Sequence, residues 1–162
     1  MEIADELGVR EYQNPGGGCL LTEKQYSLRL DDLIKYNQLE ERYIKYLSIG
    51  RHFRISPQIK IVVGRKKQDN DQMLNLIGDE IQMRINNLQG PLGIINVCSK
   101  QDVSQLNAIE EVDLLLAASI LLSFSNKSDE QGEVRFFFPD QTHKVVTVSK
   151  LNREKLREYW IT

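Results

Sequence analysis

The residue whose chemistry stands out first is Cys19, which directly follows three glycines, Gly16 to Gly18. Glycine backbones take positive φ angles and approach another molecule closely. Thr22 and Gln25 stand at capping-box spacing, so a helix is predicted to begin just after this loop. Backbone N–H groups and the macrodipole at a helix start favour a thiolate or a phosphate. Cys19 is therefore a candidate reactive thiol; the alternative is a glycine-rich connector beside a buried, inert cysteine.

A second chemical feature is the densest basic cluster of the chain, Arg65-Lys66-Lys67, which follows an apolar run ended by Gly64. Flexible cations on a loop suit contacts to RNA phosphates, which position the nucleic acid without reading its sequence. Arg51, His52 and Arg54 belong to a nearby alternating segment and are predicted to line the same basic edge. The alternative, for any one of these residues, is an ordinary solvated charge.

Other reactive residue types carry less information. Cys98 closes an apolar stretch and is interpreted as structural. His52 and His143 have no partners at metal-ligand or catalytic-triad spacing and are predicted to be ordinary surface or strand residues. The run Phe136-Phe137-Phe138 contains aromatic rings that can stack on bases. Alternation along a strand places two of its three rings in the core and one outside. No metal site is predicted.

The composition of the chain limits the classes of function that it can have. The chain has 162 residues and a net charge of −2, so RNA contact requires a local basic patch, and strong unaided binding is disfavoured. Two distant cysteines form no disulfide framework, which is typical of a reducing cytoplasm. No signal-peptide pattern occurs at the N-terminus, and the most apolar run, 114–124, is too short to span a bilayer.

Hydrophobic periodicity predicts a helical hairpin followed by a mixed domain. Helices are expected over about 23–36 and 39–49, with Gly50 placed to end the second. Residues 1–10 resemble the end of a helix, and a preceding domain is expected. After residue 51 the period becomes that of strands. The predicted strands are 51–55, 59–63, 81–85, 94–97, 133–138 and 144–148, and the predicted helices are 72–77, about 103–124 and 152–159.

This order predicts an α+β fold with a mostly antiparallel sheet and two packed helices. The expected division is a helical linker with the Gly-rich Cys loop over 1–50 and an α+β domain over 51–162.

The segment 15–22, Pro-Gly-Gly-Gly-Cys-Leu-Leu-Thr, and the helix after it resemble the region around the second catalytic cysteine of PP-loop tRNA thiouridylases of the MnmA or ThiI type. The resemblance implies that ATP activates a uridine carbonyl and that Cys19 carries a persulfide to it. The Ser-Gly-Gly-x-Asp-Ser motif and the first catalytic cysteine do not occur in this sequence. No cofactor is therefore expected in this chain, which is not catalytic alone, and ATP is expected in a missing N-terminal domain.

Residues 61–73, a strand ending in Val-Gly-Arg that leads through Asn70 into a short helix, resemble the opening of an NFACT-type RNA-binding domain. Residues 78–91 stand where that family has a His-Ala-Arg segment, and this chain has Arg84, Ile85 and Asn86 there. The apolar helix and the final hairpin follow in the family's order. The resemblance implies an NFACT-R-like fold and adds Arg84 to the RNA contacts. Such domains also occur fused behind PP-loop thiolation enzymes.

The combined interpretation is the tRNA-binding C-terminal portion of a cytoplasmic tRNA sulfur-modification protein. Its expected partners are tRNA, a sulfur-donor protein and its own PP-loop domain, with no membrane. Two alternatives stay open: a stand-alone RNA-binding module with inert Cys19, and a protein-interaction domain that lost RNA affinity, which the acidic balance favours.

Overall fold

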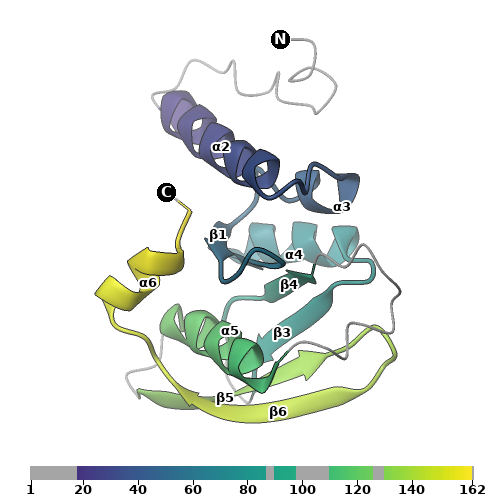
Figure 1. Cartoon of the computed structure of the whole chain (residues 1–162). Coiled ribbons are helices and arrows are strands. Elements are labelled where there is room, and N and C mark those ends of the chain that lie inside the picture. The colour runs from purple at the N-terminus through teal and green to yellow at the C-terminus, as the bar shows by residue number, and fades with distance from the viewer. Residues whose placement is uncertain (1–17, 87–89, 98–109, 126–129, 162) are drawn as a thin grey trace.

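The computed structural model describes residues 18–86, 90–97, 110–125 and 130–161, and the side chains from residue 24 onward within these ranges. Helices and strands follow one another in the mixed order expected from the sequence (Figure 1). The elements are α2 (Gly18–Lys35), α3 (Glu41–Ile44), β1 (Arg51–Arg54), β2 (Ile59–Val63), α4 (Lys67–Leu76), β3 (Ile81–Ile85), β4 (Gly93–Val97), α5 (Glu111–Ser123), β5 (Gln131–Phe137), β6 (His143–Ser149) and α6 (Arg153–Tyr159).

The strands form one six-stranded sheet in the order β1-β2-β4-β3-β5-β6, in which every neighbouring pair is antiparallel. Short turns join β1 to β2 and β5 to β6, whereas β3 and β4 pair between β2 and β5. The α+β fold class with an antiparallel sheet is therefore confirmed.

The larger core lies between the sheet and α5, which crosses the near side of the lower strands in Figure 1. Alternate strand residues such as Ile61, Met83 and Phe136 point to this side and are fully buried. Residues Ala117 and Ala118 let α5 approach the sheet closely, because their side chains are small. Burying a side chain of Ile, Met or Phe size contributes about 1.5–3 kcal/mol, so this layer dominates the stability of the domain.

The opposite face of the sheet carries a second core. Val62 and Ile94, which are paired across β2 and β4, alternate with the first set and pack on Met73 of α4 and on Tyr46. Helices on both faces thus bury the centre of the sheet, which explains why β2 is buried at every position.

The N-terminal helices pack directly on this domain. Arg29 of α2 donates two hydrogen bonds of 2.7 Å, to the carbonyls of Leu47 and Gly50. Asp32 of α2 pairs with Arg54 of β1 at 2.5 Å. Gly50 has a φ of 66°, and a Cβ there would lie 2.5 Å from the Val63 carbonyl oxygen, so glycine is required.

Several predicted boundaries were wrong. Helix α2 begins at Gly18 and not near residue 23, so Cys19 lies in its first turn and not on a loop. The capping box contributes only about 1 kcal/mol, and Leu20 and Leu21 before it are good helix formers. The second helix was expected over 39–49, but only Glu41–Ile44 is α-helical and turns follow it.

Helix α4 begins at Lys67, five residues before the predicted start, so Asp69 and Asn70 lie inside the helix. Lys67 and Gln68 are good helix formers, and tertiary contacts described below fix the two polar residues. The prediction for residues 1–10, the start of the predicted helix at 103 and Cys98 lie outside the described residues.

Candidate nucleic-acid interface

The turn between β2 and α4 brings the predicted basic cluster to the surface. Gly64 donates a backbone hydrogen bond of 2.9 Å to the Leu92 carbonyl. A Cβ on Gly64 would lie 2.1 Å from the Asn70 side-chain oxygen, so only glycine fits without movement of that side chain. The Val-Gly-Arg signal of the sequence therefore has a steric cause.

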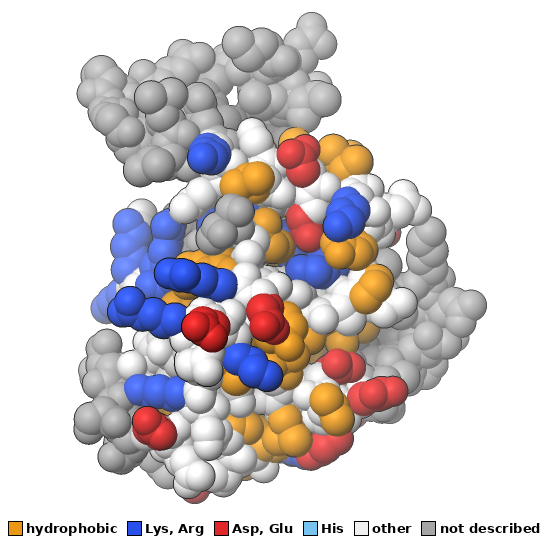
Figure 2. All heavy atoms as spheres, turned by 60° about the vertical axis from the view of Figure 1, so that its left-hand side comes forward, with side chains coloured by type: hydrophobic (Ala, Val, Ile, Leu, Met, Phe, Trp, Pro, Cys, Tyr) orange, Lys and Arg blue, Asp and Glu red, His pale blue; other side chains and the backbone are white. Residues whose placement is uncertain are grey.

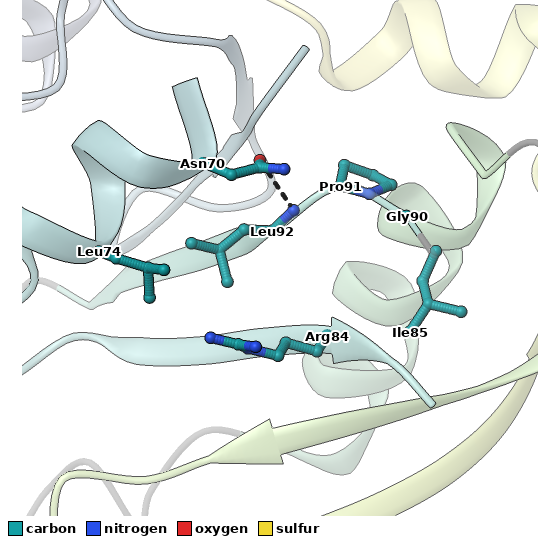
Figure 3. A pocket seen from close by; sticks show the side chains of 7 residues that line it. All are labelled: Asn70, Leu74, Arg84, Ile85, Gly90, Pro91 and Leu92. Atoms are coloured by element: carbon teal, nitrogen blue, oxygen red, sulfur yellow. Dashed lines mark hydrogen bonds between the residues drawn. The ribbon is translucent and has the colours of Figure 1, made fainter. Parts of the chain in front are cut away.

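Asn70 fixes the opposite wall. Its side-chain oxygen accepts a hydrogen bond of 3.1 Å from the backbone N–H of Leu92, as Figure 3 shows. This bond and the one from Gly64 hold both backbone polar groups of Leu92. The segment of Gly90 and Pro91 is thereby placed beside the β2–α4 turn, across a surface groove.

The groove consists of two adjoining hollows, of about 420 and 310 Å3, which share Asn70, Gly90 and Pro91 as lining. We call them together the basic groove. Its cationic lining consists of Arg51, Arg65, Lys66, Lys67 and Arg84.

Arg51 is the most firmly held of these cations. Its Nη1 donates to the Gly64 carbonyl at 3.3 Å, and its guanidinium lies 4.4 Å from the centre of the Phe124 ring. Burial lowers the pKa of Arg51, Arg65 lowers it further, and Asp69 acts in the opposite direction. An arginine remains charged after such a shift, so Arg51 places a fixed positive charge at the base of the groove.

The other cations of the first hollow are exposed to solvent. Arg65, Lys66 and Lys67 are exposed at the start of α4. The Oδ2 of Asp69 accepts a hydrogen bond of 3.0 Å from the backbone N–H of Arg65. The same oxygen lies 3.7 Å from the Nε of the Arg65 side chain. Lys66 and Lys67 form no ion pair among the described residues, and the Lys66 side chain does not cap the helix. The uncapped N-terminus of a ten-residue helix adds partial positive charge at this point.

Arg84 enters the second hollow from β3. Figure 3 shows it extending along the strand toward Leu74 of α4, below the Leu92 segment. Arg84 is exposed and forms no ion pair among the described residues. Figure 2 shows Lys and Arg side chains gathered at mid-height on its left-hand side, whereas Asp and Glu are spread over the rest of that face. A local positive surface thus exists on an acidic chain.

Residues 50–161 match the family model described as the NFACT protein RNA binding domain. The chain belongs to this family. The match assigns the sheet and the basic groove to an RNA-binding domain, as the resemblance of residues 61–73 predicted. The PP-loop resemblance of the N-terminal segment is not part of this match.

Among the solved structures that are similar in fold to this chain is the C-terminal of the fibronectin/fibrinogen-binding protein from Streptococcus suis. The TM-score is 0.55 at 14% sequence identity, and the alignment covers 82% of this chain and 58% of that chain. The chain thus spans little more than half the length of that solved chain, and the likeness concerns the fold alone. A search of curated proteins found no match.

The structure places the predicted RNA contacts of the NFACT-type domain in two locations. Arg51, Arg65, Lys66, Lys67 and Arg84 come together in the basic groove. Arg54 lies on the other side of β1, where it pairs with Asp32 and stacks 4.3 Å from the Tyr36 ring centre. Arg51 and Arg54 are three positions apart on a strand, so their side chains point to opposite faces.

The remaining candidates lie apart from the groove. Cys19 is in the first turn of α2, the helix that packs on β1 through Asp32. His52 is a strand residue of β1, in agreement with one of the two predicted positions, but it is fully buried and so does not line a basic edge. Its Nε2 lies 2.9 Å from the Tyr46 carbonyl oxygen and 2.8 Å from the Ile49 carbonyl oxygen. His143 is exposed on β6, in agreement with the prediction. The described residues contain no cluster of metal-ligating side chains.

Sequence reasoning missed the uncharged wall of the groove. The sequence predicted no role for Gly90 and Pro91, and it placed Asn70 only in the segment that leads into a short helix. The available signal was the pair of Gly64 and Asn70 at fixed spacing after a buried strand, because glycine there requires a close neighbour. Phe124, which supports Arg51, carried no signal, since only tertiary folding brings α5 and β1 together.

Within the part of the chain that the structure describes, no helix is long and apolar enough to cross a bilayer.

Proposed function

We propose that this NFACT-type domain binds tRNA through its phosphate backbone in the basic groove. The observation that carries the proposal is the set of exposed cations, Lys66, Lys67 and Arg84, without a carboxylate partner among the described residues. They line the groove together with Arg51 and the uncapped start of α4, both of which favour anions. Groups of this kind contact phosphates, which position RNA without specifying sequence.

The direct test is RNA binding by a triple variant of the exposed cations at the start of α4, Arg65→Gln, Lys66→Gln and Lys67→Gln. Loss of two or three phosphate contacts should weaken tRNA binding about 10-fold or more at moderate salt. It should also flatten the dependence of log K on log salt by about 2.

A matched control has Arg153→Gln, Lys155→Gln and Arg157→Gln on α6, which removes the same charge from exposed positions outside the groove. The proposal requires this control to lose much less affinity. Equal losses in both variants would indicate a general charge effect, and no binding by the unaltered domain would favour the protein-interaction alternative.

The proposed context is a tRNA sulfur-modification protein, for which the Gly-Gly-Gly-Cys segment is the support. Cys19 lies in the first turn of α2, where the helix dipole lowers the pKa of a thiol in general. As a persulfide, its outer sulfur would attack a uridine carbonyl carbon that ATP has adenylated on a separate PP-loop domain, and AMP would leave with the carbonyl oxygen. A second cysteine of that domain would then cleave the S–S bond and form a disulfide with Cys19. In the longer protein that this context implies, Cys19→Ser should abolish thiolation, whereas Cys98→Ser should not. Unchanged thiolation in Cys19→Ser would leave a binding module with an inert cysteine.

A further inference from the structure

One face of the strands β3, β5 and β6 is open, although their other face is buried under α5. Val146 and Phe136 point to α5 and are buried, whereas Val145 is 40% exposed and His143 is exposed. The side chains of the open face come from alternate strand positions and are exposed or half-buried: Gln82, Arg84, Glu133, Arg135, Phe137, His143, Val145 and Thr147.

Two arginines of this face stand directly opposite each other. Arg84 of β3 is in register with Arg135 of β5, and neither forms an ion pair among the described residues. Like charges at directly opposite positions destabilise a sheet. The acid on this face, Glu133, accepts instead from the Asn86 side chain at 3.1 Å. A pair of facing arginines without a counter-ion is complementary to a bound anion.

Neighbouring polar groups hold both guanidinium groups in place. When the Gln82 amide is oriented with its oxygen toward Arg84, that oxygen accepts from Nε at 2.6 Å and from Nη2 at 2.9 Å. Nη1 of Arg135 lies 3.4 Å from Nδ1 of His143. Such partners lower the entropy lost when an arginine binds a ligand.

Two rings lie beside these arginines. Phe137 and His143 are paired across β5 and β6, with ring centres 5.6 Å apart and a tilt of 47°. Phe137 is only partly buried, although a phenylalanine on the other face of the same strand is fully buried. Rings on an open sheet face, flanked by arginines, have the chemistry that stacks on unpaired bases.

The open face continues from the basic groove. Arg84 lines the second hollow of the groove and also stands in the row of the open face with Arg135. A strand of RNA that leaves the groove past Arg84 therefore meets Arg135, Phe137 and His143 next. A duplex cannot use the rings in this way, because its base faces are stacked on one another.

We propose that the open face of β3, β5 and β6 is a stacking platform for unpaired RNA bases. Arg84 and Arg135 bind the phosphates, and Phe137 and His143 receive a base. The proposal rests on the proposed function, and it assigns the RNA of this domain to single-stranded segments such as loops and ends.

The test compares a fluorescein-labelled oligouridylate with a blunt RNA duplex of equal length, measured by anisotropy. Phe137→Leu keeps an apolar side chain and removes the ring. It should weaken binding of the single strand about 5- to 100-fold and change duplex binding less than about 2-fold. Phe137→Tyr should bind the single strand as tightly as the unaltered domain does, since tyrosine keeps the stacking surface.

Phe138→Leu is the matched control, because Phe138 is the next residue and packs on the α5 side. It should leave both affinities unchanged, and thermal unfolding of each variant shows that it is folded. If Phe137→Leu weakens both RNAs equally, or neither, the platform is overturned, and the groove variants still test the groove. If the unaltered domain binds neither RNA, the proposed function itself fails, and the platform with it.

Discussion

Basic side chains lie in opposite surroundings in two regions of the molecule: most of them are exposed in the basic groove, whereas others are buried between α2 and the sheet. We call the set of Arg29, His52, Arg54 and Lys60 the buried basic cluster. Arg54 pairs with Asp32, and Arg29 donates hydrogen bonds to the backbone carbonyls of Leu47 and Gly50. Lys60 is 1% exposed, and its Nζ has no hydrogen-bond partner among the described residues.

Burial lowers the pKa of two members of the cluster, Lys60 and His52. Desolvation is the largest cause of a Lys60 pKa lowered to about 7; Asp32 raises it, and Arg54 and Arg29 lower it. Desolvation, followed by Lys60 and Arg29, lowers the pKa of His52 well below its usual value. The comparison teaches that a basic residue type identifies a binding candidate only when water and not protein surrounds its charge.

The largest expected effect is a loss of stability when the ion pair between Asp32 and Arg54 is removed. Asp32→Asn leaves Arg54 charged, buried and without its carboxylate, so the free energy of unfolding should fall by about 3 kcal/mol. Asp79→Asn is the control, since Asp79 pairs with Arg42 at 4.0 Å on the surface and should cost less than about 0.5 kcal/mol. Urea denaturation of both variants measures the difference, and equal losses would contradict the buried pair's role.

The second effect is a pH dependence of stability that comes from Lys60. Its folded pKa of about 7 is below the ordinary 10.5, so between these values the unfolded chain binds more protons. Stability should therefore rise with pH, by about 2 kcal/mol from pH 7 to about pH 9. Above about pH 10 it should fall again, because burial also raises the pKa of Tyr46.

Lys60→Met is the variant that isolates the contribution of Lys60 to the pH dependence of stability. It should remove most of the rise between pH 7 and pH 9, and Lys35→Met on the surface should not. A rise of equal size in Lys60→Met would assign the effect to other groups.

The third effect concerns the shape of the groove and not its charge. Gly64→Ala places a Cβ 2.1 Å from the Asn70 oxygen and should cost about 1–3 kcal/mol of stability. The double variant with Asn70→Ala should cost less than the sum of the two single variants, because the clash disappears. Additive costs in this double-mutant cycle would show that the two residues do not interact.

The smallest expected effect is the change in stability when the exposed cations of the groove are removed. The triple variant of Arg65, Lys66 and Lys67 should change the unfolding free energy by less than about 1 kcal/mol in total, because surface substitutions lose little. Its RNA affinity should nevertheless fall, as described above. A large loss of stability would show that these cations hold the turn together.

Much of the fold followed from local patterns. The strands β2 and β3 were predicted residue for residue, because alternation or a continuous apolar run is visible without tertiary contacts. The helix α6 was predicted to begin at residue 152, and Asn152 is its N-cap. The side-chain oxygen of Asn152 accepts a hydrogen bond of 2.9 Å from the backbone N–H of Lys155. Helix starts at α2 and α4 were wrong, since a capping pattern is a weak preference that neighbouring helix formers override.

The sequence by itself determined the α+β class, the antiparallel strands and the basic residue types of the groove, because periodicity and composition are local properties. Only the tertiary structure decided which cations act together. It buried Arg54 and Lys60 and exposed Lys66 and Arg84, because solvent access depends on which helix covers which face of the sheet. The wall of Gly90 and Pro91 and the facing pair of Arg84 and Arg135 likewise depend on strand register, which no local pattern in this sequence specifies.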